Sequence, residues 1–214
     1  MAEPPVDEGS GRRRLTARRL LGLDRSGPPP VETGSDQPLR PWTIPNAISF
    51  TRLALIPVFL VLALNTADGV GAAPAILFGV IGWGDYADGI AARVTGQYSR
   101  LGSLLDPVTD RLLLISGVIV TWHFQLLPRW ALALLAAREL AMLVIGRLAV
   151  ARGVPVVINW PGRLAVAPLA GSIFFALVGL GTVAELLLYV GLALALWASV
   201  LYAKFSIGYL HERP

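Results

Sequence analysis

Six apolar stretches, each close to the length of a membrane span, constrain this chain more than any other feature. They lie near residues 44–65, 72–92, 103–125, 129–151, 163–181 and 184–207. An α-helix needs about 20 consecutive apolar residues to cross the hydrocarbon core of a bilayer. Charged residues make up only 15% of the 214 residues, and the mean hydropathy is +0.63. A soluble domain carries about 25% charged residues. The sequence therefore predicts an all-α integral membrane protein with six transmembrane helices.

The segment before the first apolar stretch has a different composition. It is rich in Pro, Gly and Arg, with Pro28–Pro30 and the arginine runs 12–14 and 18–19 as its clearest features. Pro and Gly clusters interrupt regular structure, and a basic segment can lie as a short helix on an anionic membrane surface. We expect a basic tail over residues 1–41, disordered or partly helical, followed by one membrane domain over residues 42–210.

Basic residues between the spans predict the orientation. One side of the membrane receives Arg40, Arg93, Arg100, Arg152, Arg163, Lys204 and Arg213 together with the basic tail, and the other receives Arg129. Cytoplasmic loops carry an excess of Lys and Arg, so both termini and the loops at 93–102 and 152–162 are expected in the cytoplasm. The arginine-rich composition indicates topology rather than nucleic-acid binding. It is also typical of a GC-rich bacterial genome, and we expect a multi-pass protein of the bacterial inner membrane.

Four aspartates interrupt the second and third spans near their predicted cytoplasmic ends. Asp85 and Asp88 are three residues apart, and Asp106 and Asp110 are four apart, so each pair shares one helical face. Ionisable residues inside spans are costly and usually functional. Facing carboxylates repel one another, and an all-oxygen donor set suits Mg²⁺ or Mn²⁺. The pattern predicts a site for a divalent metal, with two ions using all four carboxylates, and a substrate that carries phosphate.

Structural roles are the alternative for each aspartate taken singly. Asp106 precedes Pro107 and could begin a helix, and Asp110 could pair with Arg111 or Arg93. Four aspartates at these spacings, with glycines between them, favour the functional interpretation.

The residues between the two acidic pairs favour a close approach of a ligand. Gly89 lets a ligand approach the backbone beside Asp88, and the small side chain of Ala92 leaves space on the same helical face. Arg93 can bind a phosphate through two hydrogen bonds, and Gly102 opens the third span beside the aspartates.

This stretch resembles the signature of the CDP-alcohol phosphatidyltransferase family, Asp-x2-Asp-Gly-x2-Ala-Arg-x8-Gly-x3-Asp-x3-Asp. Every defined position matches, at Asp85, Asp88, Gly89, Ala92, Arg93, Gly102, Asp106 and Asp110. The resemblance implies transfer of a phosphatidyl group from CDP-diacylglycerol to a hydroxyl acceptor, with release of CMP. It also implies metal bound by Asp85, Asp88 and Asp106, and a homodimer. Asp110 would contact the metal site and act as the general base.

The same resemblance implies the CDP site. Its residues would be Gly89, Ala92, Arg93 and Gly102, and the opening of the first span, which is also similar to the family, would add Asn46, Thr51 and Arg52.

The acceptor depends on the second half of the chain. Arg138-Glu139 and Gly162-Arg163 are similar to the phosphatidylglycerophosphate synthase branch, in which a Gly-Lys-x-Lys-Thr stretch opens the fifth span. Here Arg163 keeps the first cation, and the second Lys and the Thr are missing. We expect glycerol 3-phosphate as acceptor, with its phosphate near Arg138, Arg147 and Arg163.

Other functions remain open at this stage. Within the family, the alternatives are a cardiolipin synthase and a phosphatidylinositol phosphate synthase. In a different class, an acidic cluster could serve a cation transporter or a metal-dependent membrane sensor. Conduction would favour carboxylates spread through the depth of the membrane, whereas these four lie together near one end of two spans.

Overall fold

The computed structural model describes residues 38–151 and 160–211, without the side chains of 148–151, 161, 163 and 206–211. Within these ranges the chain is all-helical. The six helices are α2 (Ile44–Leu64), α3 (Ala72–Thr95), α4 (Arg100–His123), α5 (Arg129–Ala151), α6 (Trp160–Leu177) and α7 (Gly181–His211). The all-helical part of the prediction is confirmed, and each of the six helices overlaps a predicted span. The tail expected over residues 1–41 lies almost entirely outside the described residues.

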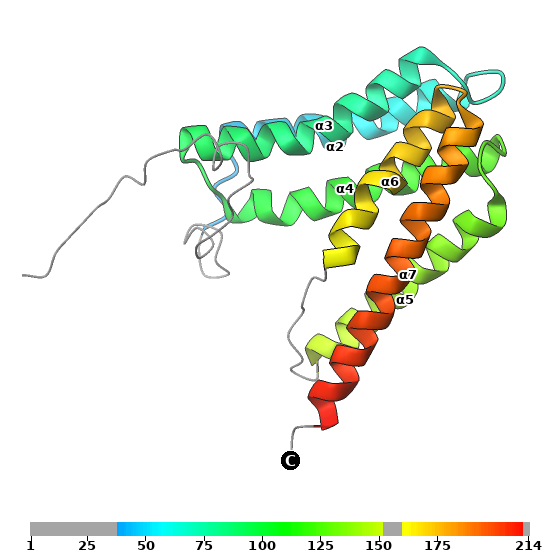
Figure 1. Ribbon diagram of the computed structural model, residues 1–214. Coiled ribbons are helices and arrows are strands. Elements are labelled where there is room, and N and C mark those ends of the chain that lie inside the picture. Colours follow the sequence, from blue (N-terminus) through cyan, green and yellow to red (C-terminus); the bar gives the residue numbers. More distant parts are fainter. Residues whose placement is uncertain (1–37, 152–159, 212–214) are drawn as a thin grey trace, which may run out of the picture.

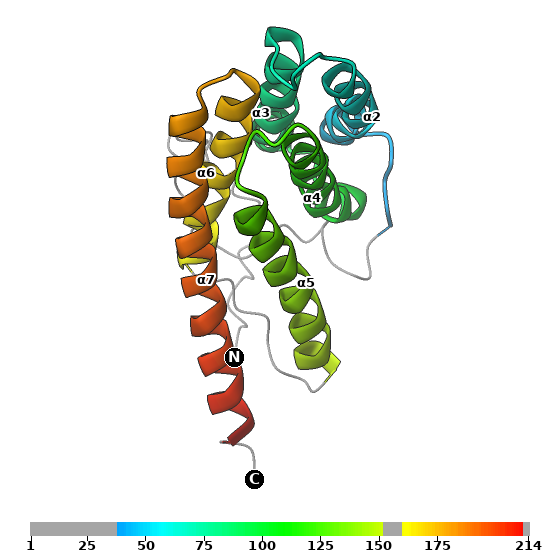
Figure 2. The ribbon, with the colours of Figure 1, turned by 90° about the vertical axis from the view of Figure 1, so that its right-hand side faces the viewer.

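The helices form two groups that meet at one end (Figures 1 and 2). In the first group, α2 packs against α3 and α4, and in the second, α6 and α7 run side by side. Phe59, Phe78 and Ile81 belong to a buried cluster that joins the first group to α6. Leu132 and Leu188 belong to a second cluster within α5, α6 and α7. The groups diverge toward the end at which α3 is connected to α4.

The connection between α3 and α4 is shorter than the predicted loop at 93–102. Gly96 ends α3 in the left-handed conformation, with φ of 66°, as is common after a helix C-terminus. Ser99 caps α4, because its Oγ accepts a hydrogen bond from the Gly102 backbone N at 3.0 Å. Both acidic pairs therefore lie inside regular helices.

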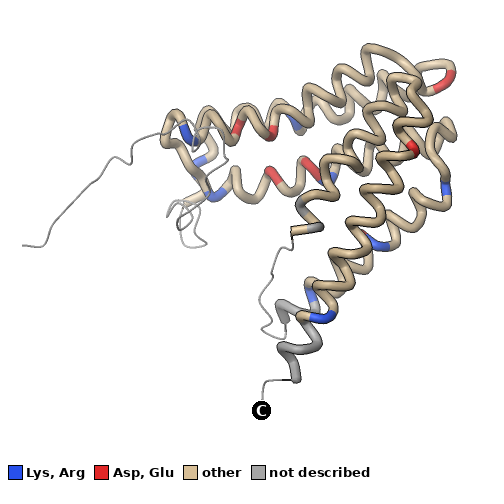
Figure 3. The backbone as a smooth tube through the Cα atoms, in the orientation of Figure 1, with Lys and Arg blue, Asp and Glu red and all other residues tan. Residues whose placement is uncertain are grey.

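The outer surfaces of the helices suit a lipid environment. By length and composition, α2 and residues 181–205 of α7 could each cross a membrane, among the residues that the structure describes. In α3, α4 and α5, charged residues interrupt the apolar sequence (Figure 3). Large apolar side chains such as Val61, Ile76 and Trp83 are exposed. Extensive exposed apolar surface marks a protein that contacts a membrane or a partner.

Candidate active site

A polar face on the otherwise apolar helix α2 organises the site. Asn46, Ser49 and Arg52 are spaced three residues apart, and all three are almost completely buried. Residues at this spacing lie on neighbouring parts of one helical face. Because buried polar groups require partners, this face points to the polar residues of α3 and α4.

Arg52 lies among the aspartates. Its Nη1 donates to Asp88 at 3.0 Å and to Asp85 at 3.5 Å, and its Nη2 donates to Asp110 at 2.7 Å. Its Nε donates to the backbone carbonyl of Ile81 at 2.9 Å. One guanidinium therefore fixes three carboxylates from two different helices. The sequence-based hypothesis that Asp110 pairs with Arg93 or Arg111 is replaced by this pairing with Arg52.

Gly84 makes room for the Arg52 side chain. A Cβ at position 84 would lie 2.6 Å from Cδ of Arg52 and 2.8 Å from its Cγ. Carbon atoms do not approach this closely without strain, so any larger residue at position 84 would displace Arg52.

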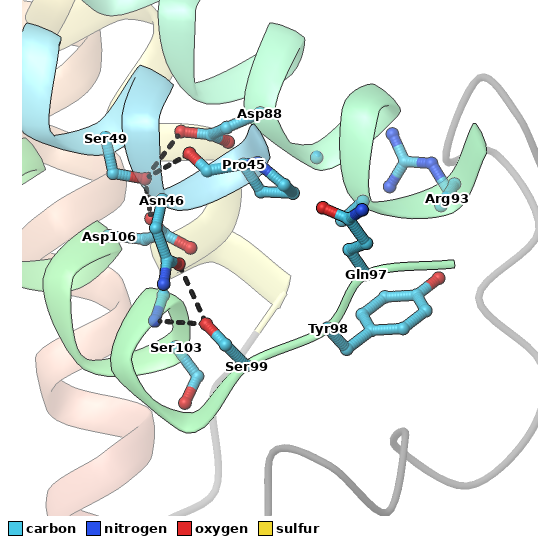
Figure 4. Close-up of a pocket in the computed structure, with 13 residues that line it drawn as sticks. Pro45, Asn46, Ser49, Asp88, Arg93, Gln97, Tyr98, Ser99, Ser103 and Asp106 are labelled. Carbon is cyan, nitrogen blue, oxygen red and sulfur yellow. Dashed lines mark hydrogen bonds between the residues drawn. The ribbon is translucent and has the colours of Figure 1, made fainter. Parts of the chain in front are cut away.

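Ser49 connects the fourth aspartate to the cluster. Its Oγ lies 3.1 Å from Asp106 Oδ1, 3.3 Å from Asp88 Oδ2 and 3.2 Å from the Pro45 carbonyl (Figure 4). A hydroxyl has one proton to donate, so these three acceptors share it. Arg52 and Ser49 together bring all four predicted aspartates to one site.

A cavity of about 190 Å³ lies beside this cluster. Seven of its lining residues were expected from the sequence, namely Asn46, Asp88, Gly89, Ala92, Arg93, Gly102 and Asp106. Ser49, Gln97, Tyr98 and Ser99 also line it and were not expected. Figure 4 shows Ser49 and the two aspartates on one side of the cavity, and Arg93, Gln97 and Tyr98 on the other.

Asn46 shapes the end of the cavity rather than extending freely into it. Its amide donates to the backbone carbonyls of Arg40 and Pro41, and its Oδ1 accepts from Ser99 Oγ at 2.8 Å. A Cβ at position 102 would lie 2.8 Å from Asn46 Oδ1, so Gly102 is needed for this close packing. A Cβ at Gly89 would meet the Arg93 guanidinium at 3.5 Å, which is an ordinary contact. Packing therefore does not require glycine at position 89, but the absence of a side chain there leaves more space in the cavity.

Thr51 does not reach this cavity. Its Oγ1 donates to the Ala47 carbonyl at 2.8 Å within α2. Thr51 lines a different cavity, of about 330 Å³, between α2 and α3. The i+3 spacing of Asn46, Ser49 and Arg52 was the signal that would have selected Ser49 instead of Thr51.

The donor atoms of the cluster fit a hard divalent cation. They are carboxylate oxygens and one hydroxyl, which Mg²⁺ and Mn²⁺ prefer, and the Asp85 and Asp110 side chains are about half exposed. In the described part of the chain, no three acidic, histidine or cysteine side chains converge as a preformed metal site. The Arg52 guanidinium contacts three of the four carboxylates. Its single positive charge does not neutralise four carboxylates, so the cluster keeps a net negative charge that a cation could balance.

Of the arginines predicted to bind the acceptor, Arg138 makes its contacts within the protein. Arg138 donates from Nε to Ser199 of α7 at 2.8 Å and from Nη1 to Glu139. Arg147 is exposed, and the Arg163 side chain lies outside the described residues. Arg111, which was not predicted as an acceptor residue, donates to Glu139 at 3.0 Å and so joins α4 to α5.

Comparison with known proteins places the chain in one family. Residues 42–197 match the family described as CDP-alcohol phosphatidyltransferase. The chain is 35% identical to a cardiolipin synthase (CMP-forming) of Streptomyces coelicolor, over 86% of this chain and 89% of that protein. It is 43% identical to a putative cardiolipin synthase of Mycobacterium tuberculosis, over 45% of this chain and 46% of that protein. A CDP-diacylglycerol–glycerol-3-phosphate 3-phosphatidyltransferase of Bacillus subtilis is 31% identical, over 58% of this chain and 70% of that protein.

Proposed function

The chain belongs to the CDP-alcohol phosphatidyltransferase family of membrane enzymes, and from this premise we propose that it forms cardiolipin. The donor would be CDP-diacylglycerol, the acceptor phosphatidylglycerol and the other product CMP. The observation that carries this choice of acceptor is the similarity over most of the chain to a CMP-forming cardiolipin synthase. Relatives named for phosphatidylglycerophosphate synthesis match over little more than half of the chain.

We assign the cytidine diphosphate part of the donor to the cavity beside the aspartates. Gly89, Ala92 and Gly102 give it a wall of small residues, and Arg93 stands where a phosphate can be bound through two hydrogen bonds. Asn46 and Ser99 are joined by a hydrogen bond next to Gly102, so a ligand meets a fixed surface there. Membership of the family implies use of a divalent metal ion, and Asp85, Asp88 and Asp106 would hold it, with Asp110 beside them.

The proposed reaction is a displacement at phosphorus. The acceptor hydroxyl oxygen forms a bond to the phosphorus that carries diacylglycerol, and the bond from this phosphorus to the oxygen of the CMP phosphate breaks. The bound cation would neutralise the negative charge of the diphosphate. Asp110 takes the proton of the attacking hydroxyl. Because Asp110 is about half exposed while Asp88 is buried, it is the better placed of the two to meet a second substrate.

The hydrogen bond from Arg52 to Asp110 orients the proposed base. It occupies Oδ1 of the carboxylate, which leaves Oδ2 for the acceptor. A carboxylate held by a buried guanidinium cannot rotate freely, and such positioning is worth a large part of the rate in bimolecular reactions.

The same proposal includes the setting in the membrane. We infer that the site faces the cytoplasm, because Arg93 and Arg100 flank the connection between α3 and α4, next to the aspartates, and cytoplasmic loops carry an excess of basic residues. The enzyme would work as a homodimer in a bacterial inner membrane.

A second candidate acceptor is glycerol 3-phosphate. The Arg138-Glu139 pair and the similarity to the Bacillus subtilis enzyme favour it. Both arginines that contact Glu139 share their charge with that carboxylate, so the three groups keep one net positive charge, which does not balance the dianionic phosphate of this acceptor.

The test is a competition between acceptors. Purified protein in detergent micelles is given CDP-diacylglycerol and Mg²⁺ with phosphatidylglycerol, glycerol 3-phosphate or inositol phosphate, and CMP and the lipid products are identified by mass spectrometry. We expect CMP and cardiolipin only with phosphatidylglycerol, and no product with the Asp110→Asn protein. Product from glycerol 3-phosphate alone would establish the second candidate instead.

A further inference from the structure

An apolar cavity between α4 and α5 has no role in the site described above. Its volume is about 330 Å³, and residues of α6 and α7 also line it. The residues from the two facing helices include Leu114, Ile115 and Val118 of α4 and Leu135, Leu140 and Leu143 of α5. Glu139 and Ser172 are its only polar lining residues among those described, and the Ser172 hydroxyl is used by the Leu169 carbonyl. We call this cavity the α4–α5 groove.

We propose that the α4–α5 groove holds an acyl chain of the lipid acceptor, an inference that rests on the proposed function. The two helices diverge from the loop that joins them (Figures 1 and 2). Alkyl chains gain free energy in proportion to the apolar surface that they bury. A groove lined by leucine, isoleucine and valine therefore suits a lipid tail.

The groove leads to the proposed base. Leu114, Ile115 and Val118 form one stripe on α4, and the same stripe continues one turn back to Asp110 and Arg111. One helical turn is about 5.4 Å. An acyl chain in the groove would therefore place its headgroup beside Asp110, where the attacking hydroxyl is required.

The charges at this end of the groove fit an anionic headgroup. Arg111 donates to one carboxylate oxygen of Glu139 at 3.0 Å, and Arg138 donates to the other. Two guanidinium groups around one carboxylate leave net positive charge. Phosphatidylglycerol carries one negative charge, on its phosphodiester, so it complements this cluster. Arg147 lies one turn beyond Leu143 on α5 and is exposed, which extends the positive end of the groove.

The position of the groove selects the acceptor rather than the donor. The donor cavity is bounded by α2, α3 and the start of α4 and includes Asp88 and Asp106. The separate cavity between α2 and α3 borders Arg52, so it also lies on the side of the acidic cluster that faces α2 and α3. The groove lies on the other side of α4 and leads to Asp110. A water-soluble acceptor such as glycerol 3-phosphate has no chain to place in it.

Filling the groove with a bulky side chain tests the proposal. Leu140→Trp and Ile119→Trp add bulk from opposite walls at positions that are partly exposed. Leu134→Trp is the control, because Leu134 is also exposed on α5 but does not line the groove. Displacing about two methylene groups corresponds to a roughly tenfold loss of affinity. We therefore expect about a tenfold rise in KM for long-chain phosphatidylglycerol in both groove variants, with KM for CDP-diacylglycerol unchanged.

The acyl-chain dependence adds a second readout. The wild-type protein and the Leu134→Trp protein should prefer long-chain over dihexanoyl phosphatidylglycerol, and the groove variants should lose most of that preference. A rise in KM for CDP-diacylglycerol instead would assign the groove to the donor. A changed oligomeric state with unchanged KM values would assign it to a second copy of the chain. Groove variants that match the control would overturn the proposal while cardiolipin synthesis by the wild type still stands.

A labelling experiment covers the case in which the groove variants do not fold. Wild-type protein is irradiated with phosphatidylglycerol that carries a diazirine in one acyl chain, and tryptic peptides are analysed. We expect labelling in the tryptic peptides that contain groove residues, which are 112–129, 130–138, 139–147 and 164–204, reduced by unlabelled phosphatidylglycerol but not by CDP-diacylglycerol. Labelling elsewhere, or labelling that only CDP-diacylglycerol reduces, would contradict the assignment. If the wild type makes no cardiolipin from phosphatidylglycerol, it is the proposed function that fails.

Discussion

Arg52 donates a hydrogen bond of 2.7 Å to Asp110, and this contact joins α2 to α4. Through Asp88, the same guanidinium also joins α2 to α3. A cation that was expected to approach the nucleotide thus lies inside the acidic cluster. It lowers the repulsion between carboxylates and fixes the direction in which Asp110 points. Arg52 is therefore a positioning residue for the proposed base.

Replacing Arg52 tests this role. Arg52→Met keeps an unbranched apolar stem and removes the charged guanidinium, which leaves buried Asp88 without its cation. Breaking a buried ion pair costs roughly 3 kcal/mol or more, so we expect a clear fall in thermal stability in detergent and loss of turnover. Arg129→Met is the control, because Arg129 is exposed and its guanidinium donates to the backbone carbonyl of Trp122, away from the aspartates. Normal turnover by Arg52→Met would contradict the positioning role.

Gly84 provides a milder perturbation of the same contact. In Gly84→Ala the new Cβ would press on Arg52 Cδ at 2.6 Å, and such overpacking costs roughly 1–3 kcal/mol. We expect at least a tenfold fall in kcat, because Asp110 moves with Arg52. Gly82→Ala lies in the same helix and meets Leu113 at 3.8 Å, so it should keep wild-type turnover. Equal activity of the two variants would show that the packing around Arg52 does not matter.

The helices were predictable because their signals are local. Span length and apolar composition predicted all six of the described helices, and a cap or a glycine in the left-handed conformation explains the shifted ends at the α3–α4 connection and after α6. Gly96 and Ser99 shorten the connection between α3 and α4, and Gly179, with φ of 88°, ends α6 earlier than expected. The pairing of aspartates was likewise visible in the i+3 and i+4 spacing.

The contacts between helices were not predictable in the same way. The Arg111–Glu139 pair depends on how α4 and α5 are rotated about their axes, and the bond from Arg138 to Ser199 depends on the neighbour that α5 finds in α7. A single sequence does not contain this information. Ser49 was not predicted, although its spacing from Asn46 and Arg52 is visible in the sequence; a serine within an apolar helix commonly bonds to its own backbone, so its presence alone does not indicate a site.

Asp110→Asn tests the proposed general base. The amide keeps the size of the side chain and can still accept a hydrogen bond from Arg52, but it cannot take a proton from the acceptor. General-base catalysis is worth about 10²–10⁴ in rate, so kcat should fall by that factor while binding of CDP-diacylglycerol changes little. Asp68→Asn is the control, since Asp68 is exposed in the loop before α3. Retained turnover by Asp110→Asn would assign the base elsewhere.

Ser49→Ala tests whether the buried hydroxyl holds the carboxylates of Asp88 and Asp106 in the positions that the metal ion would require. The substitution removes a donor shared by both carboxylates while Arg52 and the four aspartates remain. Removing a group that orients metal ligands typically lowers metal affinity 10–100-fold. We therefore expect the Mg²⁺ concentration for half-maximal activity to rise at least tenfold, with kcat at saturating Mg²⁺ near that of the wild type. Ser116→Ala is the matched control, because Ser116 is also buried in a helix but donates to the Leu112 carbonyl of its own helix. A loss of kcat that excess Mg²⁺ does not restore would mean that Ser49 acts on the reaction itself rather than on the arrangement of the carboxylates.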